Sequence, residues 1–177
     1  ATVHAALDRG VTFFDTAEGY DDDSHSEEVL GRALAGRRTE AVIATKISPS
    51  HLVPALVEGA WDASLRRLQT DYIDLYQIHF ADPGTPIEET LRALDDLVHQ
   101  GKARYIGCSN FTGWQLMKSL WISDVNNLAR FDSHQPRYNL LKREIEAELL
   151  PACAAEGVGV IPYNPLGGGL LTGKHTK

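Results

Sequence analysis

Four side chains of this sequence could together carry out a proton transfer: the carboxylate of Asp15, the phenol of Tyr20, the ammonium of Lys46 and the imidazole of His79. A phenol has a pKa of about 10 in water, so it donates a proton at neutral pH only where something stabilises the phenolate. A nearby ammonium does this, and a carboxylate beside the ammonium keeps it charged and aimed. An imidazole could hold the oxygen that receives the proton. The set fits protonation of a carbonyl oxygen as hydride reaches its carbon, with the hydride supplied by a reduced cofactor.

These residues lie where hydrophobic, strand-like runs end. Six such ends are polar, in the order Asp15, Lys46, His79, the pair Ser109 and Asn110, Gln135, and Tyr163. One polar residue in such a place is usually a solvated strand terminus. Six in succession favour a shared site, because the ends of parallel strands in a barrel meet at one mouth. Tyr20, five residues beyond Asp15, could bend back into that mouth.

The elements that must position these residues alternate regularly between strand and helix. The strand-like runs are VTFFDTA, AVIATK, YIDLYQIH, ARYIGCSN, FDSHQ and GVGVIPYN. Between them lie five stretches with helical periodicity, which include 24–36, 52–68 and the segment PIEETLRALDDLVHQG, which opens with proline and closes with glycine. Alternating units of this kind predict parallel strands, because each helix returns the chain to the starting edge of the sheet.

The same periodicity predicts which helical side chains are buried. In the helix over 24–36 it places Val29, Leu30, Ala33 and Leu34 on one face. The three tryptophans, Trp61, Trp114 and Trp121, fall in predicted helices. Packing against the sheet is the ordinary role of such large aromatic side chains, so we expect all three to be buried.

A barrel explains the pattern better than an open, doubly wound sheet. Such a sheet commonly has a glycine-rich turn after its first strand, but the turn here is acidic and contains only Gly19. Each strand and helix unit occupies about 30 residues, close to the spacing of a (β/α)8 barrel. We therefore expect residues 1–177 to form a single α/β domain, an incomplete (β/α)8 TIM barrel with about six of the eight strands, truncated at both ends.

The motifs GVTFFDTAEGY, ATK, QIH, IGCSNF, FDSHQPRYN and VIPYNPLGGGLLTGK resemble those of the aldo-keto reductases, in the order of that family and over essentially the whole chain. The resemblance corresponds to strands 2 to 7 of the family's barrel. It implies that Asp15, Tyr20, Lys46 and His79 form a catalytic tetrad in which Tyr20 is the proton donor. The activity implied is reduction of an aldehyde or ketone to an alcohol.

The same resemblance implies a nicotinamide cofactor. Ser109, Asn110 and Gln135 match residues that hydrogen-bond the nicotinamide carboxamide, and Tyr163 matches the aromatic residue that stacks on its ring. The loop that follows the pyrophosphate would contain Asn164, Pro165, Leu166 and Gly168, and Lys174 could reach the phosphates. NADPH is the coenzyme expected from the family, and NADH is possible.

Two alternative functions remain open. A nucleotide-sensing regulatory subunit similar to the potassium-channel β-subunits would keep the cofactor site, although those subunits usually carry asparagine where this chain has His79. Another TIM-barrel enzyme, such as a phosphosugar isomerase, would explain the fold but not Tyr20 and Lys46. The run DDDSHSEE, residues 21–28, could bind a divalent metal, but adjacent carboxylates in a loop are mostly solvated, so we expect no metal site.

Composition narrows the class of partner. The net charge of -7 argues against nucleic acids and anionic membranes, which need clustered Lys and Arg. We expect a small-molecule carbonyl substrate, while the oligomeric state is left open. No stretch has the roughly 20 apolar residues of a membrane span. Cys108 and Cys153 lie far apart in apolar surroundings, which favours a reduced, cytoplasmic protein.

Overall fold

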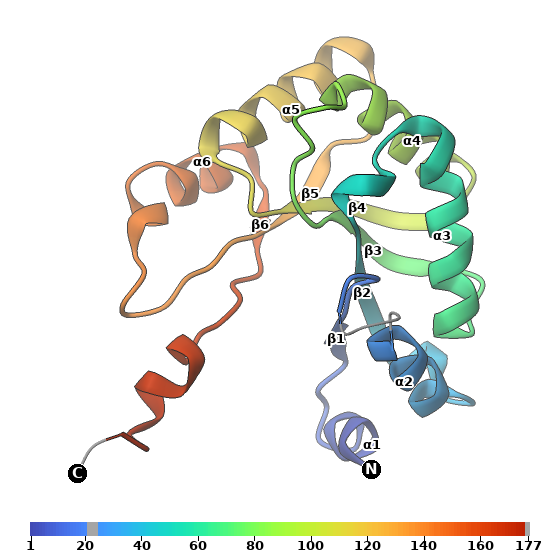
Figure 1. Cartoon of the computed structure of the whole chain (residues 1–177), viewed down its shortest axis with the longest axis vertical. Coiled ribbons are helices and arrows are strands. Elements are labelled where there is room, and N and C mark those ends of the chain that lie inside the picture. The colour runs from blue at the N-terminus through green and yellow to red at the C-terminus, as the bar shows by residue number, and fades with distance from the viewer. Residues whose placement is uncertain (21–24, 176–177) are drawn as a thin grey trace.

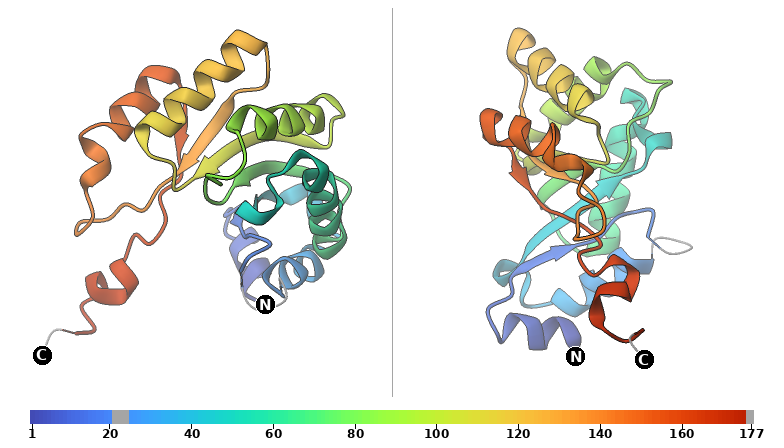
Figure 2. Two further views of the ribbon diagram at one scale, coloured as in Figure 1. Left: turned by 45° about the horizontal axis from the view of Figure 1, so that its top comes forward. Right: turned by 90° about the vertical axis from the view of Figure 1, so that its left-hand side faces the viewer.

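The structure, a computed structural model, describes residues 1–20 and 25–175 and consists of one curled parallel sheet with helices on its outer side (Figure 1; Figure 2). The strands are β1 (Phe13–Asp15), β2 (Val42–Ile47), β3 (Ile73–Ile78), β4 (Ala103–Ser109), β5 (Phe131–Gln135) and β6 (Gly159–Val160). Their spatial order is their order along the chain, and every neighbouring pair is parallel. The prediction of an incomplete (β/α)8 barrel with six strands is therefore confirmed.

A helix follows each of the first five strands. The α-helices are α1 (Thr2–Leu7), α2 (His25–Leu34), α3 (Pro54–Leu68), α4 (Ile87–His99), α5 (Gly113–Asn126) and α6 (Leu149–Glu156). Short 3-10 helices lie in the connections: η2 (Arg38–Glu40), η3 (Pro49–His51), η4 (Glu144–Glu146) and η5 (Gly167–Thr172). The segment that contains η5 leaves the end of β6 and runs away from the sheet (Figure 1).

Local sequence explains where the long helices begin and end. Pro86 directly precedes α4, and Gly101, with φ of +69°, follows its end. Helix α5 begins with a capping box in which the side chains of Thr112 and Gln115 bond each other's backbone N–H groups, satisfying two donors that the first turn leaves unpaired. A cap of this kind stabilises a helix by about 1 kcal/mol. These signals fix the two ends of α4 and the start of α5.

The register of the sheet separates a polar inner face from an apolar outer face. A row of paired positions across β2 to β5 lies on the inner face: Lys46, Gln77, Gly107 and Ser133. Glycine is needed in this row, because a Cβ at Gly107 would lie 2.8 Å from the Ser133 carbonyl oxygen. On the outer face Ile43, Tyr76 and Cys108 are fully buried beneath the helices. The inner row therefore supplies polar groups to the barrel mouth while the outer face builds the core.

The predicted buried face of α2 is confirmed for Leu30 and Leu34, whereas Ala33 is half-buried and Val29 is not buried. Val29 is 44% exposed, whereas Glu27 is fully buried and Gly31 lies against the end of α3. The glycine allows this contact: a Cβ at Gly31 would lie 2.6 Å from the Arg67 carbonyl oxygen. On the same side Glu27 forms an ion pair with Arg67 of α3.

The expectation that all three tryptophans are buried is wrong for two of them. Trp61 is fully buried and meets Tyr76 edge-to-face, with ring centroids 4.9 Å apart. Trp114 and Trp121 are 61% and 62% exposed on α5, because the helix turns Leu116 and Leu120 toward the sheet instead. A helical residue on the side away from the buried stripe faces water whatever its size.

The last strand is shorter than its hydrophobic run. Pairing in β6 ends at Val160, and Tyr163 makes only an isolated bridge with Arg137. The N–H groups of Ile161 and Tyr163, on either side of Pro162, still bond the carbonyl oxygens of His134 and Pro136, so the chain stays alongside β5 beyond the end of regular pairing. Tyr163 therefore lies in a connecting segment rather than within a strand.

Both cysteines are buried free thiols. Burial raises the pKa of the Cys108 thiol well above its usual range, and it also raises that of Cys153. No helix in residues 1–20 and 25–175 has the length and apolar character needed to cross a membrane.

Two glycines in neighbouring helices should respond oppositely to alanine. Gly31→Ala forces a methyl group into the backbone of α3, so we expect a loss of about 1 to 3 kcal/mol in unfolding free energy. Gly59→Ala in α3 meets nothing within 4 Å and should gain about 0.5 to 1 kcal/mol from helix propensity. Urea denaturation of both variants measures the two changes, and effects of the same sign would contradict this account of the α2 and α3 contact.

Candidate active site

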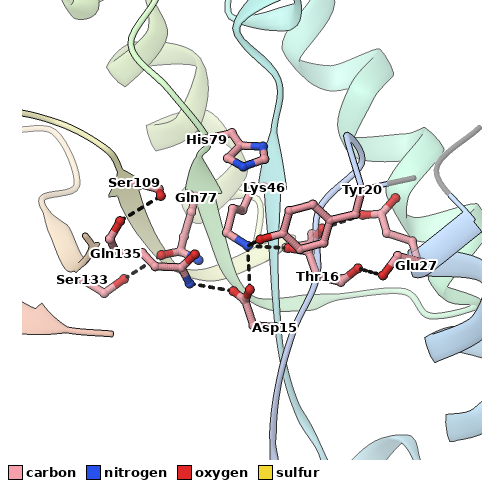
Figure 3. A network of polar contacts seen from close by, with 12 residues as sticks. Asp15, Thr16, Tyr20, Glu27, Lys46, Gln77, His79, Ser109, Ser133 and Gln135 are labelled. Atoms are coloured by element: carbon pink, nitrogen blue, oxygen red, sulfur yellow. Dashed lines mark hydrogen bonds and ion pairs between the residues drawn. The ribbon is translucent and has the colours of Figure 1, made fainter. Parts of the chain in front are cut away.

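Lys46 is the centre of the polar cluster at the carboxyl ends of the strands (Figure 3). Its side chain is fully buried, and its ammonium makes three hydrogen bonds: 2.7 Å to Asp15 Oδ2, 2.8 Å to the Thr16 carbonyl oxygen and 2.9 Å to the Tyr20 hydroxyl. A buried ammonium is tolerated where it is paired and all its protons are bonded. Lys46 thereby ties the end of β1 and the following turn to β2.

His79 closes the other side of the Tyr20 phenol. The two rings meet edge-to-face with centroids 5.6 Å apart, and the Phe80 ring stacks on the imidazole with centroids 4.8 Å apart. Burial, and then the positive charge of Lys46, lower the pKa of His79 below its usual value. The imidazole is therefore neutral at pH 7, so one ring nitrogen can donate a hydrogen bond and the other can accept one.

A chain of amide and hydroxyl groups connects this cluster to the next strands. Gln135 Nε2 donates to Asp15 Oδ1 at 2.8 Å, and the Ser109 hydroxyl donates to the Gln135 carbonyl oxygen at 2.8 Å. Asn110 Nδ2 donates to the His79 carbonyl oxygen at 3.1 Å, and the Tyr163 hydroxyl donates to Asn110 Oδ1 at 2.9 Å. The residues predicted for the cofactor side thus contact the residues predicted for catalysis.

Asn110 occupies a backbone conformation that few residues adopt. Its φ is +59°, in the left-handed region that asparagine tolerates better than most side chains. This bend turns the chain sharply after β4 and brings the amide back over the end of β3. The side chain is then held by Ser109 and Tyr163 as well as by the His79 carbonyl.

The glycine-rich loop lies apart from the cluster, on the segment that runs away from the sheet (Figure 1). The predicted loop residues lie there together: Asn164, Pro165, Leu166, Gly168 and Lys174. Asn164 has φ of +59° and its Oδ1 accepts a hydrogen bond from the Gly168 N–H at 2.8 Å. The Lys174 side chain lies close over Gly169, where a Cβ would be 2.7 Å from its Cε. Contact of this loop with a pyrophosphate stays a prediction.

His134 faces away from Gln135, as strand alternation predicts. It is fully buried on the outer face, and its Nε2 lies 3.0 Å from the Phe111 carbonyl oxygen. Nδ1 has no hydrogen-bond partner among the described residues, so the buried ring fits the neutral form. Burial lowers the pKa of His134 to about 4, although the hydrogen bond to Phe111 raises it. His134 is a core residue rather than a ligand.

Three parts of the site were not found by sequence reasoning. The Thr16 carbonyl oxygen bonds Lys46, and no residue type could signal a backbone acceptor. Gln77 is fully buried beside Lys46 in the inner row, and its position two residues before His79 was the available signal. Glu18 is also buried, and nothing in the sequence of the acidic turn sets it apart. Residues 21–24, half of the acidic run over 21–28, lie outside the described residues.

The family of the chain follows from comparison with known proteins. The model of the aldo/keto reductase family matches residues 1–177. The chain belongs to this family. Membership of an oxidoreductase family argues against the phosphosugar isomerase that the fold had left open.

Three relatives illustrate the range of the family around this chain. Aldo-keto reductase YhdN of Bacillus subtilis is 39% identical over 186 residues, covering 99% of this chain and 54% of that protein. A probable voltage-gated potassium channel subunit beta of Arabidopsis thaliana is 38% identical, covering 96% and 55%. The crystal structure of an aldo/keto reductase from Klebsiella pneumoniae in complex with NADP and acetate has a TM-score of 0.85 and 36% identity, covering 99% and 59%. The chain spans about half the length of the curated relatives it matches.

Acid should destabilise the protein through His134. Because the folded pKa is about 4 and the unfolded value is about 6.5, the unfolded state binds the proton more readily. The free energy of unfolding should therefore fall as the pH is lowered from about 6.5 toward 4, by up to about 3 kcal/mol from this residue. Urea titrations across this pH range should show a shallower fall in His134→Gln. Equal slopes in the unsubstituted protein and in His134→Gln would refute the assignment.

Removal of the negative charge of Asp15 should lower the free energy of unfolding far more than removal of a carboxylate charge from an exposed ion pair. In Asp15→Asn the new NH2 group must face either the Lys46 ammonium or the Gln135 amide donor, which leaves a buried charge poorly paired. We expect a loss of about 3 kcal/mol in unfolding free energy. Asp8→Asn, which breaks an exposed 2.9 Å pair with Arg37, should cost under about 1 kcal/mol. Chemical denaturation measures both losses in unfolding free energy. Similar losses in the two variants would contradict the importance of the Lys46 ion pair for stability.

Proposed function

We propose that the protein reduces an aldehyde or ketone to an alcohol, with NADPH as the hydride donor and Tyr20 as the proton donor. The observation that carries the proposal is the fully buried Lys46 ammonium, 2.9 Å from the Tyr20 hydroxyl and 2.7 Å from Asp15. A buried cation against a phenol oxygen has little structural purpose that an apolar side chain could not fulfil at lower cost. Stabilisation of a phenolate gives it one.

The direction of the hydrogen bonds suits proton donation by Tyr20. The ammonium of Lys46 can only donate, so the Tyr20 oxygen is the acceptor in their bond, and the proton of the phenol remains available to a substrate. As that proton leaves, negative charge develops on an oxygen that already faces the buried cation. Asp15 and the Thr16 carbonyl hold Lys46 in place, so little reorganisation accompanies the transfer.

His79 would position the substrate oxygen. Its ring meets the Tyr20 ring edge-to-face at the same mouth, and its lowered pKa keeps it neutral at pH 7. A neutral imidazole can donate a hydrogen bond to a carbonyl oxygen without competing as the acid. Tyr20 and His79 together would then aim the oxygen so that its carbon is presented to the hydride donor.

The residues beside this pair suit a nicotinamide. NADPH supplies the hydride when bound. Ser109, Asn110 and Gln135 form a connected edge of amide and hydroxyl groups next to Asp15, which could exchange hydrogen bonds with a carboxamide. Tyr163 adds an aromatic ring, held by its hydroxyl to Asn110. The Klebsiella pneumoniae relative was crystallised with NADP, which supports the phosphorylated coenzyme, and NADH is the comparison to test.

A regulatory subunit that senses nucleotide is the second candidate. The resemblance to a probable potassium channel subunit beta of Arabidopsis thaliana favours it. Such a protein would bind NADPH and turn over carbonyl compounds negligibly. His79 favours the enzyme, because a neutral imidazole beside Tyr20 has a clear role in the reaction. Titration of the full-length protein with NADPH and NADH, followed by a carbonyl screen with whichever binds, separates the two.

Tyr20→Phe tests the assignment of the proton donor. The variant keeps the ring against His79 but has no proton to give, so kcat for carbonyl reduction should fall by at least about 100-fold. Because the hydroxyl is on the substrate side, the Kd for NADPH, measured by nucleotide fluorescence, should change by less than about threefold.

Tyr105→Phe provides the matched control, since Tyr105 is 57% exposed on β4 and has no place in the cluster. It should retain the kcat of the unsubstituted protein. Undiminished turnover in Tyr20→Phe would remove Tyr20 from the mechanism. Tight NADPH binding without any turnover in the unsubstituted protein would favour the regulatory subunit.

A further inference from the structure

Glu18 is a buried carboxylate that none of the roles above uses. It lies in the turn between β1 and α2, two residues before Tyr20, and its side chain is 6% exposed. Its Oε1 accepts a hydrogen bond from the backbone N–H of Ser48 and lies 2.9 Å from His51 Nδ1. Both partners follow β2, the strand that carries Lys46. The carboxylate therefore joins the turn that ends at Tyr20 to the segment directly beyond Lys46.

The backbone of this turn is held at several points along the same edge. The Thr16 N–H bonds the Ala44 carbonyl oxygen at 2.9 Å, and the Glu18 N–H bonds that of Lys46 at 3.2 Å. The Tyr20 N–H then bonds the Ala17 carbonyl oxygen at 3.2 Å, closing the turn. After Glu18 the chain turns away from β2. The side chain of Glu18 is therefore the contact with the segment after β2 that lies nearest in sequence to the Tyr20 phenol.

Gly19 makes the position of this turn matter for the active site. A Cβ at Gly19 would lie 3.3 Å from the Ser48 hydroxyl and 3.8 Å from His79 Nδ1. The backbone between Glu18 and Tyr20 thus lies close to both Ser48 and the imidazole. A small displacement of the turn would change the distance from the Tyr20 hydroxyl to Lys46 and the angle between the Tyr20 and His79 rings together.

Glu18 also lies near charged residues of α2 and α3. Arg67 of α3 lies 3.9 Å from Glu18 Oε2 and donates to the fully buried Glu27 at 2.6 Å. Glu27 in turn accepts a hydrogen bond of 2.6 Å from the hydroxyl of Thr45, the residue before Lys46. The network connects α2, α3 and β2 on the outer side of the same strand that presents Lys46 on the inner side.

We infer that Glu18 is a positioning residue for the proton transfer: its bond to the Ser48 amide holds the Tyr20 phenol at the distance from Lys46 and His79 that the reaction needs. The inference rests on the proposed reductase function. Glu18 touches neither the predicted substrate site nor the predicted cofactor residues, so it acts through Tyr20. Because misplacement of a reacting group by about 1 Å can cost 100-fold in rate, one lost backbone contact is enough to matter.

Substitution of Glu18 in the full-length protein separates placement from binding. Glu18→Ala should lower kcat by about 10- to 100-fold and leave the carbonyl KM and the NADPH Kd within about threefold. The solvent deuterium isotope effect on kcat should rise, because proton transfer becomes more rate-limiting. Glu18→Gln should recover most of the activity, since its amide oxygen can still accept from the Ser48 N–H.

Ser48→Pro removes the same contact from the other side. Ser48 has φ of -73°, which proline adopts without strain, so the substitution deletes the amide donor while the backbone keeps its path. Ser48→Pro should lower kcat as Glu18→Ala does. Its loss in kcat should be at least fivefold larger than that of Ser48→Ala, which keeps the amide donor. Combined with Glu18→Ala it should cost little further, since both variants break one interaction.

Glu58→Ala is the matched control, because Glu58 is an exposed glutamate of α3 paired with Lys102. It should keep the kcat of the unsubstituted protein. The inference is overturned if Glu18→Ala retains full kcat, if NADPH affinity falls in step with kcat, or if Glu18→Gln is no better than Glu18→Ala. Turnover in the unsubstituted protein separates these outcomes from failure of the proposed function, in which no carbonyl compound would be reduced at all.

Discussion

The buried ammonium of Lys46 is the interaction on which the rest of the site depends. A fully desolvated cation is costly unless each of its protons has a partner. Here the three partners come from one short segment, which begins with the last residue of β1 and continues into the turn after it. The demand for these partners decides where that segment must lie. A carboxylate, a carbonyl group and a phenol are thereby gathered around a point that water does not reach. Catalytic geometry and folding stability are in this way two results of the same constraint.

The alternation of side chains between the two faces of β2 allows this arrangement. Lys46 lies on the inner face while its neighbour Thr45 faces outward to Glu27. A shift of one residue in register would exchange the two and separate the Lys46 ammonium from its three partners on the inner side. The outer network of Glu27 and Arg67 therefore secures the inner site, because it pins the register of the strand that carries Lys46.

Much of the architecture could be predicted because it follows from the local periodicity of hydrophobic residues. Alternating strand and helix patterns gave the parallel order, and the polar residues at strand ends gave the members of the cluster that the structure brings together. The side chain of His134 was also placed correctly, because alternation along β5 decides its face. What these cases share is that each depends on the chain within a few residues of the position concerned.

The features that were missed depend on partners distant in sequence. Val29 was predicted to be buried instead of Glu27, because the ion pair that buries Glu27 comes from Arg67 on another helix. The exposure of Trp114 and Trp121 follows from which side of α5 its leucines take, and hydrophobicity alone does not rank the two stripes. The role of Glu18 was missed because its acceptor role needs the Ser48 amide, which only the folded turn brings near.

The uneven placement of the tryptophans determines what optical spectroscopy can report about the protein. Trp61, packed edge-on against Tyr76, emits from the apolar core and follows its integrity. Trp114 and Trp121 stand in water on one helix, so collisional quenchers reach these two indoles first and their emission lies further to the red. Intrinsic fluorescence is accordingly two signals in one spectrum, and a change at its red edge describes the surface of α5 rather than the loss of the native state.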